Sequence, residues 1–121
     1  MATSNKRAIG NIGEEAVCRF LEQKGAEILC RNYTIRGGEI DIIAQYGDML
    51  LFVEVKTRQP HALQSGAAAV DLRKQQCVRR TAEQYLLTLA QPPAQTRFDV
   101  AEVEYAGHTV HRIRYIPGAF Y

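Results

Sequence analysis

Residues 39–57 predict a β-hairpin, and no other segment limits the fold of this chain as strongly. Glu39 to Tyr46 and Met49 to Thr57 are two apolar runs of strand length, separated by Gly47-Asp48. A two-residue loop that begins with glycine suits a type II′ turn. Such a loop fixes the register, because Tyr46 then pairs with Met49 and every other cross-strand pair follows.

Four charged side chains interrupt these apolar runs, namely Glu39, Asp41, Glu54 and Lys56. Side chains alternate between the two faces of a strand, so Glu39 shares a face with Asp41, and Glu54 shares one with Lys56. The predicted register puts Asp41 opposite Glu54 and Glu39 opposite Lys56. Opposed Cβ atoms lie roughly 4.5–5.5 Å apart, and like charges at that distance destabilise a sheet.

Two opposed acids in an apolar hairpin need a compensating partner, because an isolated buried carboxylate is strongly disfavoured. Either one carboxyl is protonated or a cation lies between Asp41 and Glu54. Paired Asp and Glu oxygens suit Mg²⁺ or Mn²⁺, with water completing the coordination. Lys56 could then hold an anion or a water beside the metal. This spacing indicates a metal-centred phosphate site.

A second interpretation needs no metal. Glu39 and Lys56 could form an ordinary cross-strand ion pair, with Asp41 and its neighbour Glu54 on a solvated face. The residues Ile43 and Phe52 share the acidic face, so that face is not simply polar. Hairpin geometry alone leaves the two interpretations open.

The rest of the chain follows helical and strand patterns that give the order α-β-β-β-α-β-β. Gly25 is a plausible stop for the first helix, and Pro92-Pro93 prevents continuation of the second. An Ala106-Gly107 turn joins the last two strands. No internal repeat or linker divides residues 1–121, so we expect one domain. Beside the hairpin, the expected elements are a helix at Asn5–Lys24, a strand at Ala26–Ile35, a helix at Ala67–Leu89 and strands at Arg97–Tyr105 and His108–Ile116.

Composition excludes several classes of protein. The 121 residues are 46% hydrophobic, and no apolar run approaches the ~20 residues of a membrane-spanning helix. The N-terminus lacks the apolar core of a signal peptide, so we expect a cytoplasmic protein without a membrane partner. Three dispersed cysteines favour neither a disulfide framework nor structural zinc. A formal charge of +2 is too small to indicate nucleic-acid binding by itself.

Several motifs resemble those of known proteins. Asp41 followed by Glu54-Val55-Lys56 looks like the core of the PD-(D/E)XK nucleases. More closely, the chain resembles the YraN family of small bacterial proteins, which is itself similar to archaeal Holliday-junction resolvases. The matching pieces span nearly the whole chain and are GNIGEEAVCRFLEQKG, RNYTIRGGEIDIIA, FVEVKTR, AVDLRKQ and RFDVAEV. The resemblance implies an α/β fold with a mixed β-sheet flanked by helices, a restriction-endonuclease-like core, and a divalent metal site.

The resemblance also assigns roles to individual residues. Asp41 and Glu54 would be metal ligands, the Val55 carbonyl a third, and Glu14 a ligand either directly or through water. Glu14 is chosen over Glu15 by resemblance alone, since both lie well off the apolar stripe of their helix.

Two further residues would assist the chemistry. Lys56 would position or deprotonate the attacking water, or stabilise the charge that develops on the phosphate. Glu39 would lie behind it and orient the Lys56 side chain. Ile40 stands where the superfamily motif has proline, at a position that carries no chemistry.

Eleven basic residues are candidate phosphate contacts, although for any one of them a solvated surface charge is the favoured interpretation. Arg36 and Arg58 flank the acidic hairpin, and Lys74 and Arg73 lie in a family-matching stretch. Without a base-reading motif, we expect recognition through backbone and shape, with strong salt dependence. The full set is Lys6, Arg7, Arg19, Arg31, Arg36, Arg58, Arg73, Lys74, Arg79, Arg80 and Arg97.

The sequence therefore predicts a Mg²⁺- or Mn²⁺-dependent endonuclease that hydrolyses DNA phosphodiester bonds, in branched or flapped DNA by the resolvase likeness. The alternative is a non-catalytic nucleic-acid-binding or adaptor protein that retains the fold. RNA as the substrate is left open. A homodimer follows by analogy, because symmetric cleavage of a junction needs two active sites.

Overall fold

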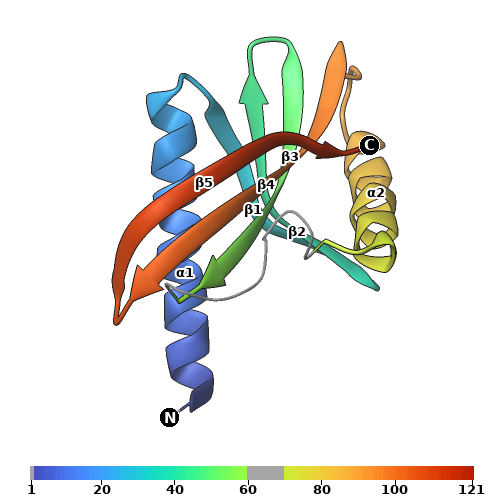
Figure 1. The fold of residues 1–121 in the computed structure, drawn as a ribbon. Coiled ribbons are helices and arrows are strands. Elements are labelled where there is room, and N and C mark those ends of the chain that lie inside the picture. The colour runs from blue at the N-terminus through green and yellow to red at the C-terminus, as the bar shows by residue number, and fades with distance from the viewer. Residues whose placement is uncertain (1, 60–69) are drawn as a thin grey trace.

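The computed structural model describes residues 2–59 and 70–121 and contains the predicted succession of elements (Figure 1). The order α-β-β-β-α-β-β is confirmed. The elements are α1 (Ala2–Gln23), β1 (Glu27–Ile35), β2 (Gly38–Tyr46), β3 (Met49–Arg58), α2 (Leu72–Leu86), β4 (Gln95–Ala106) and β5 (Thr109–Phe120).

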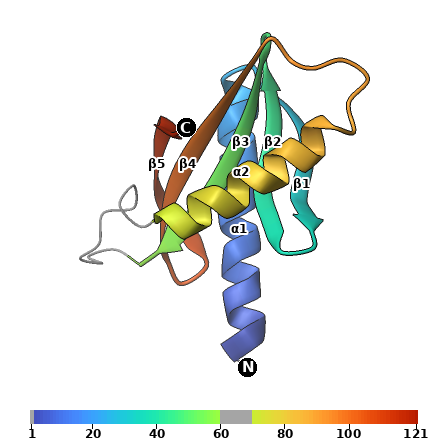
Figure 2. The ribbon, with the colours of Figure 1, turned by 90° about the vertical axis from the view of Figure 1, so that its right-hand side faces the viewer.

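The strands form one mixed sheet in the order β1-β2-β3-β4-β5. All neighbours are antiparallel except β3 and β4, which run parallel. Parallel strands need a crossover connection, and α2 lies in it. Figure 2 shows α2 across one face of the sheet and α1 behind the other, so the predicted α/β domain with helices flanking a mixed sheet is confirmed.

Each helix covers its own hydrophobic core, because the central strands are apolar on both faces. The core under α1 contains Val17 and Leu21 of the helix with Ile42, Val53 and Val103 of the sheet. The core under α2 contains Val78 and Ala82 of the helix with Ile43, Phe52 and Val100. The sheet is therefore the middle layer of three.

The helix ends follow local chemistry. Gly25 has φ +99°, and the Ala26 N–H donates to the Leu21 carbonyl at 3.0 Å, which is the pattern of a Schellman cap. The predicted stop of α1 is thus confirmed, while its start lies three residues earlier than predicted. Neither described helix is long and apolar enough to cross a bilayer.

Three further boundaries differ from the prediction. Asp71 caps α2, accepting from the Lys74 N–H at 2.8 Å, so this helix starts at Leu72 rather than at Ala67, which lies outside the described residues. It ends at Leu86, before the predicted Leu89. The last hairpin turns at residues 107–108, one residue later than predicted, because Ala106 pairs with Thr109.

Candidate active site

The hairpin register is as predicted near its turn and differs from the prediction further along. Tyr46 pairs with Met49, Gly47 has φ +60°, and the ladder continues to Ile42 and Val53. There β2 and β3 diverge (Figure 1). Asp41 stands at the divergence, where its Oδ2 accepts from the N–H of Val55 on β3 at 2.8 Å. A carboxylate therefore takes the place of the next ladder bond.

Strict alternation along β2 breaks at Asp41. Ile42 packs in the core under α1, whereas Ile40 packs under α2. The β1–β2 ladder is interrupted at the same point, opposite Asn32, which has φ +54°. Asparagine adopts this left-handed conformation more readily than most residues do. The prediction that Glu39 and Asp41 lie on one regular face is therefore wrong.

Glu39 does not lie opposite Lys56, because the ladder between their strands ends before reaching them. Its Cα partner is Thr34 of β1, whose hydroxyl donates to Glu39 Oε2 at 3.2 Å. Lys56 instead has Glu102 of β4 as its Cα partner. Glu102 was not singled out from the sequence, since nothing local indicates that β4 runs parallel to β3.

The Asp41–Glu54 contact is present although the ladder does not extend to it. Glu54 is 3% exposed, and this burial raises its pKa to about 9, with a hydrogen bond to Asp41 and the Asp41 charge acting in the same direction. The positive charges of Lys74 and Lys56 oppose that rise. Protonation of Glu54 at neutral pH therefore relieves the repulsion that the register predicts.

One oxygen of Glu54 is left without a hydrogen bond. Oε1 is buried and has no such partner, while the Lys74 Nζ lies 3.6 Å away as an ion pair. Buried polar atoms are nearly always satisfied, so an exception of this kind needs an explanation. Lys74, predicted as a phosphate contact, is thus a neighbour of the carboxyl pair.

The Glu14 side chain of α1 lies beside Asp41 of the carboxyl pair, because the helix packs closely on the sheet. A Cβ on Gly13 would lie 2.5 Å from Thr57 Cγ2 of β3, so only glycine allows this approach. The Glu14 side chain is 13% exposed and accepts from Asn32 Nδ2 at 3.1 Å. Burial, and then the charge of Asp41, raise the pKa of Glu14, while Asn32 and Arg31 lower it.

Glu15 is directed elsewhere. Its side chain is 48% exposed and pairs with Arg31 at 2.8 Å and with Arg19 at 3.3 Å. Glu14, and not Glu15, is therefore the helix glutamate beside Asp41. Asn32 was not recognised from the sequence, where the available signal was an asparagine, a residue depleted in strands, inside a predicted strand.

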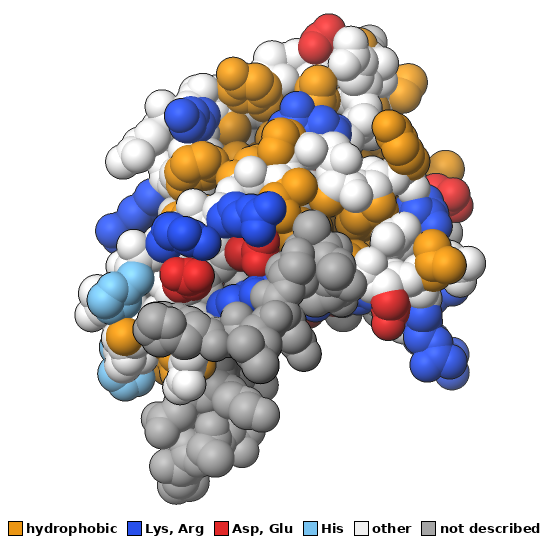
Figure 3. All heavy atoms as spheres, in the orientation of Figure 1, with side chains coloured by type: hydrophobic (Ala, Val, Ile, Leu, Met, Phe, Trp, Pro, Cys, Tyr) orange, Lys and Arg blue, Asp and Glu red, His pale blue; other side chains and the backbone are white. Residues whose placement is uncertain are grey.

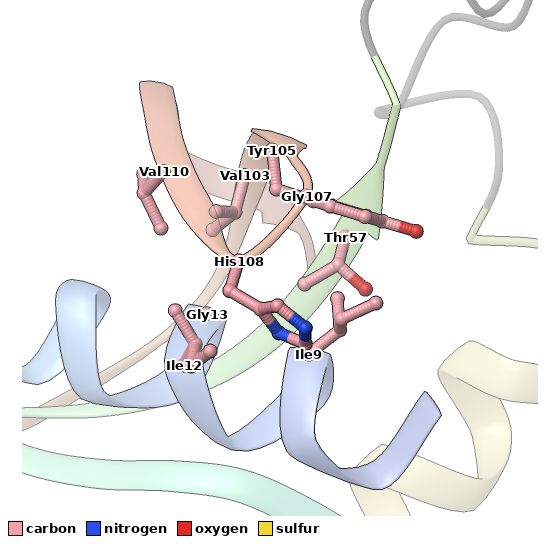
Figure 4. A pocket seen from close by; sticks show the side chains of 9 residues that line it. All are labelled: Ile9, Ile12, Gly13, Thr57, Val103, Tyr105, Gly107, His108 and Val110. Atoms are coloured by element: carbon pink, nitrogen blue, oxygen red, sulfur yellow. The ribbon is translucent and has the colours of Figure 1, made fainter. Parts of the chain in front are cut away.

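The close approach of α1 also forms a narrow crevice at the far ends of β3 and β4 (Figure 4). In Figure 4, Ile9 and Ile12 of α1 lie near Thr57 and the turn that carries His108. The lining is mostly apolar. Its packing fixes the position of α1 and, with it, that of Glu14. The lining residues are Ile9, Ile12, Gly13, Thr57, Val103, Tyr105, Gly107, His108 and Val110.

Comparison with known sequences assigns the chain to a protein family. The profile described as "Uncharacterised protein family UPF0102" matches residues 13–103. The chain belongs to the UPF0102 family. A UPF0102 protein of Symbiobacterium thermophilum is 44% identical over 115 residues, which are 95% of this chain and 98% of that one. One from Parafrankia is 45% identical over 112 residues, 93% and 95% of the two chains, and one from Alkaliphilus oremlandii is 42% identical over 118 residues, 96% and 99%.

The stretch matched by the UPF0102 profile contains Glu14, Asp41, Glu54 and Lys56. The YraN-like resemblance of the sequence is thereby confirmed at the level of the family. The arginines of β5 lie beyond the matched residues.

The donors suit a divalent ion held partly by water. Within residues 2–59 and 70–121, no three His, Cys, Asp or Glu side chains form a group that could hold a metal. Mg²⁺, however, is commonly bound by one or two carboxylates, with water and substrate phosphate completing the octahedron. Asp41 and Glu54, which touch and leave one buried oxygen unpaired, fit that requirement.

The basic residues predicted to bind nucleic acid divide into two groups. Arg58 is held by Glu102 at 2.7 Å and is 16% exposed, and Lys74 faces Glu54. Arg36 and Arg73 are exposed. Arg36 precedes β2 and Arg58 ends β3, so these two lie on the diverging arms of the hairpin.

Proposed function

We propose that this UPF0102 protein is a Mg²⁺- or Mn²⁺-dependent endonuclease that hydrolyses phosphodiester bonds in DNA. The observation that carries the proposal is the buried Glu54 carboxyl, which touches Asp41, has an oxygen without a hydrogen bond, and lies beside a lysine of α2. Glu102 Oε1 is also buried without a hydrogen bond, but Glu54 in addition touches a second acid, Asp41. In a metal-binding pair of carboxylates the unpaired oxygen becomes a ligand.

The proposed roles follow from the positions of the side chains. On this proposal Asp41 and Glu54 hold the ion with the Val55 carbonyl, and Glu14 contacts it through a bound water. A bound divalent ion supplies a Lewis acid and a water of lowered pKa. Lys56 and Lys74 flank the carboxyl pair as cations that can hold phosphate oxygens or orient the water.

The resemblance to PD-(D/E)XK nucleases supports the same assignment. Asp41 and the Glu54-Val55-Lys56 stretch lie on two diverging strands, next to a glutamate on the first helix. On this proposal the sheet and its helices are a restriction-endonuclease-like core. The resolvase likeness favours branched or flapped DNA as the substrate and a homodimer as the working unit.

Cleavage of labelled four-way, flap and plain duplex DNA tests the proposal. Wild type should cut with Mn²⁺ or Mg²⁺ and not with EDTA, at low salt. Asp41→Asn should lose cleavage, while its amide oxygen can still accept from the Val55 N–H and preserve the fold. Asp48→Ala is the matched control, since it removes an exposed aspartate from the turn of the same hairpin. An equally active Asp41→Asn would overturn the proposal.

A non-catalytic DNA-binding adaptor is the second candidate. It is favoured by the lack of a three-ligand group among the residues that the structure describes. In the cleavage assay an adaptor would bind DNA in a salt-sensitive way and never cut, with or without Asp41. A parallel RNA duplex and flap series distinguishes an enzyme that acts on RNA.

A further inference from the structure

A charged part of the sheet begins beside the carboxyl pair and continues across three strands. We call it the arginine face. It consists of two residues each from β3, β4 and β5, which are Lys56, Arg58, Glu102, Glu104, Arg112 and Arg114. The two β5 arginines were not among the candidates named from the sequence.

Packing and ion pairs show that these side chains share one side of the sheet. Val103 of β4 and Ile113 of β5 pack in the core under α1, so their neighbours in each strand point to the opposite side. There Arg114 pairs with Glu102 and Arg112 with Glu104. In Figure 3 basic and acidic side chains gather over β4 and β5.

The helix on this side leaves the arginine face accessible within the described chain. α2 packs mainly against β2 and, to a smaller extent, against β1. In Figure 1 the turn that joins β4 and β5 lies away from α2, whereas the carbonyl of Tyr121, after β5, accepts from Arg79 of α2. The arginine face therefore continues from Glu54 and Lys56 outward to the edge strand, as a track that leads to the candidate site.

The cations on this face are outermost and their carboxylates lie beneath. The Arg112 and Arg114 side chains are 65% and 58% exposed, whereas those of Glu104 and Glu102 are 29% and 7% exposed. The ion-pair distances are 3.4 Å for Arg112–Glu104 and 3.5 Å for Arg114–Glu102. A guanidinium has five N–H donors, so an arginine fixed by one carboxylate still offers donors to a phosphate.

Charge complementarity then selects the ligand. Four cationic side chains face two carboxylates on this surface, and the surplus is positive. Arginine pairs with phosphate through parallel N–H donors, and most protein contacts to DNA are made to its backbone. An acidic polymer with regularly spaced phosphates fits a row of arginines that ends at a phosphodiesterase site.

We propose that the arginine face binds the sugar-phosphate backbone of the DNA beside the scissile bond, with Arg112 and Arg114 as its main contacts. This inference rests on the proposed function for the identity of its ligand. It adds the path by which the duplex approaches Asp41 and Glu54. These arginines would position the substrate and take no part in the chemical step.

DNA binding in EDTA tests the inference without cleavage. The affinity for a labelled duplex is measured against salt concentration for wild type, Arg112→Gln, Arg114→Gln and the double variant. Each lost phosphate contact should flatten the plot of log affinity against log salt by about 0.9, and the double variant should bind roughly tenfold more weakly at low salt. Arg114→Lys should retain most of the binding, since it keeps the charge.

Lys24→Gln is the matched control. Lys24 is an exposed cation outside the candidate phosphate contacts, and it lies over the Phe20 ring at the end of α1, on the other side of the sheet. It should leave affinity and salt slope unchanged. If the double variant binds with the wild-type slope while folding normally, the inference is wrong and the arginines serve only to hold Glu102 and Glu104. Arg112→Gln alone remains informative if Arg114→Gln does not fold.

The inference and the proposed function fail in different ways. DNA binding that depends on Arg112 and Arg114, without cleavage in the presence of any metal, would support DNA binding by the arginine face and would rule out the proposed nuclease activity. Cleavage that depends on Asp41 but not on these arginines would support the nuclease activity and would rule out DNA binding by the arginine face. A wild-type protein that neither binds nor cuts DNA overturns both.

Discussion

Among the residues that the structure describes, the buried carboxylates are those of Glu54, Asp99 and Glu102, and the first two differ most clearly in what surrounds them. Asp99 of β4 is fully buried and accepts four hydrogen bonds, from Arg97 Nε at 2.8 Å, Arg97 Nη2 at 3.0 Å, the Tyr115 hydroxyl at 2.6 Å and the Gly118 N–H at 2.8 Å. Glu54 of β3 is 3% exposed, touches another acid, and leaves Oε1 without a hydrogen bond.

Burial alone therefore does not separate a structural acid from a functional one. The donors of Asp99 are complete, so it ties the end of β5 to β4 as a charged anchor. The environment of Glu54 disfavours its charge, as expected of the metal ligand that we propose. The same comparison explains why Tyr115, whose burial and bond to Asp99 raise its pKa, belongs to the structural network.

The largest expected effect is on the structural side of this comparison. Asp99→Ala leaves Arg97, the Tyr115 hydroxyl and the Gly118 N–H without their acceptor, so it should lower the free energy of unfolding by about 3 kcal/mol. Urea denaturation measures this loss. The control is Asp48→Ala at the hairpin turn, which should cost little. A loss for Asp99→Ala as small as that of the control would mean that the network is not an anchor.

The second effect concerns the metal. If Glu54 and Asp41 bind Mn²⁺, then Mn²⁺ at 100 times its dissociation constant should stabilise the wild type by about 2.7 kcal/mol. Asp41→Asn should remove this gain, because one ligand charge is lost. Thermal unfolding with and without EDTA gives both values. Equal stabilisation of the two proteins would place the ion elsewhere.

The third effect is the pH dependence that Glu54 imposes. Burial raises its pKa from 4.5 to about 9, so the folded protein keeps a proton that the unfolded chain releases. The contribution to stability is complete below pH 4.5 and is lost as the pH rises to about 9. The Glu54→Gln side chain cannot ionise. Near pH 9 and without metal, the free energy of unfolding of this variant should therefore exceed that of wild type by roughly 1–3 kcal/mol.

Urea denaturation in EDTA across this pH range tests the Glu54 effect. Glu22→Gln, which removes an exposed carboxylate of α1, should follow the wild-type curve. A Glu54→Gln difference that does not change with pH would show that Glu54 is charged in the folded protein, as a structural acid would be.

The smallest effect concerns the helix that brings Glu14 to the site. Gly13→Ala forces a Cβ to within 2.5 Å of Thr57 Cγ2, so α1 must shift, at a cost of roughly 1–2 kcal/mol. Gly10→Ala is the control in the same helix, where a Cβ meets nothing within 4 Å. That change should instead stabilise by about 0.5–1 kcal/mol. Thermal denaturation measures the stability change of each variant. Equal changes would mean that the structure around Gly13 adjusts to the added methyl group without cost.

Much of the fold was predictable because its signals are local. The two-residue turn at Gly47 fixed the Tyr46–Met49 register, and Gly25 marked the end of α1. The start of α2 was predicted too early, although Asp71 is a good capping residue, because the apolar spacing continues upstream of it. The register failed at Asp41, where a side chain replaces a backbone partner, which no periodicity reveals.

The sequence by itself determined the order of elements, the hairpin and the contact between Asp41 and Glu54, since each depends on local patterns and on one short turn. Only the tertiary structure decided that Glu14 rather than Glu15 faces Asp41, that Lys74 reaches Glu54, and that Glu102 lies beside Lys56. The physical reason is that these contacts join elements far apart in the chain. Their geometry depends on how α1, α2 and the parallel β4 pack on the sheet, and a local pattern of residues does not contain it.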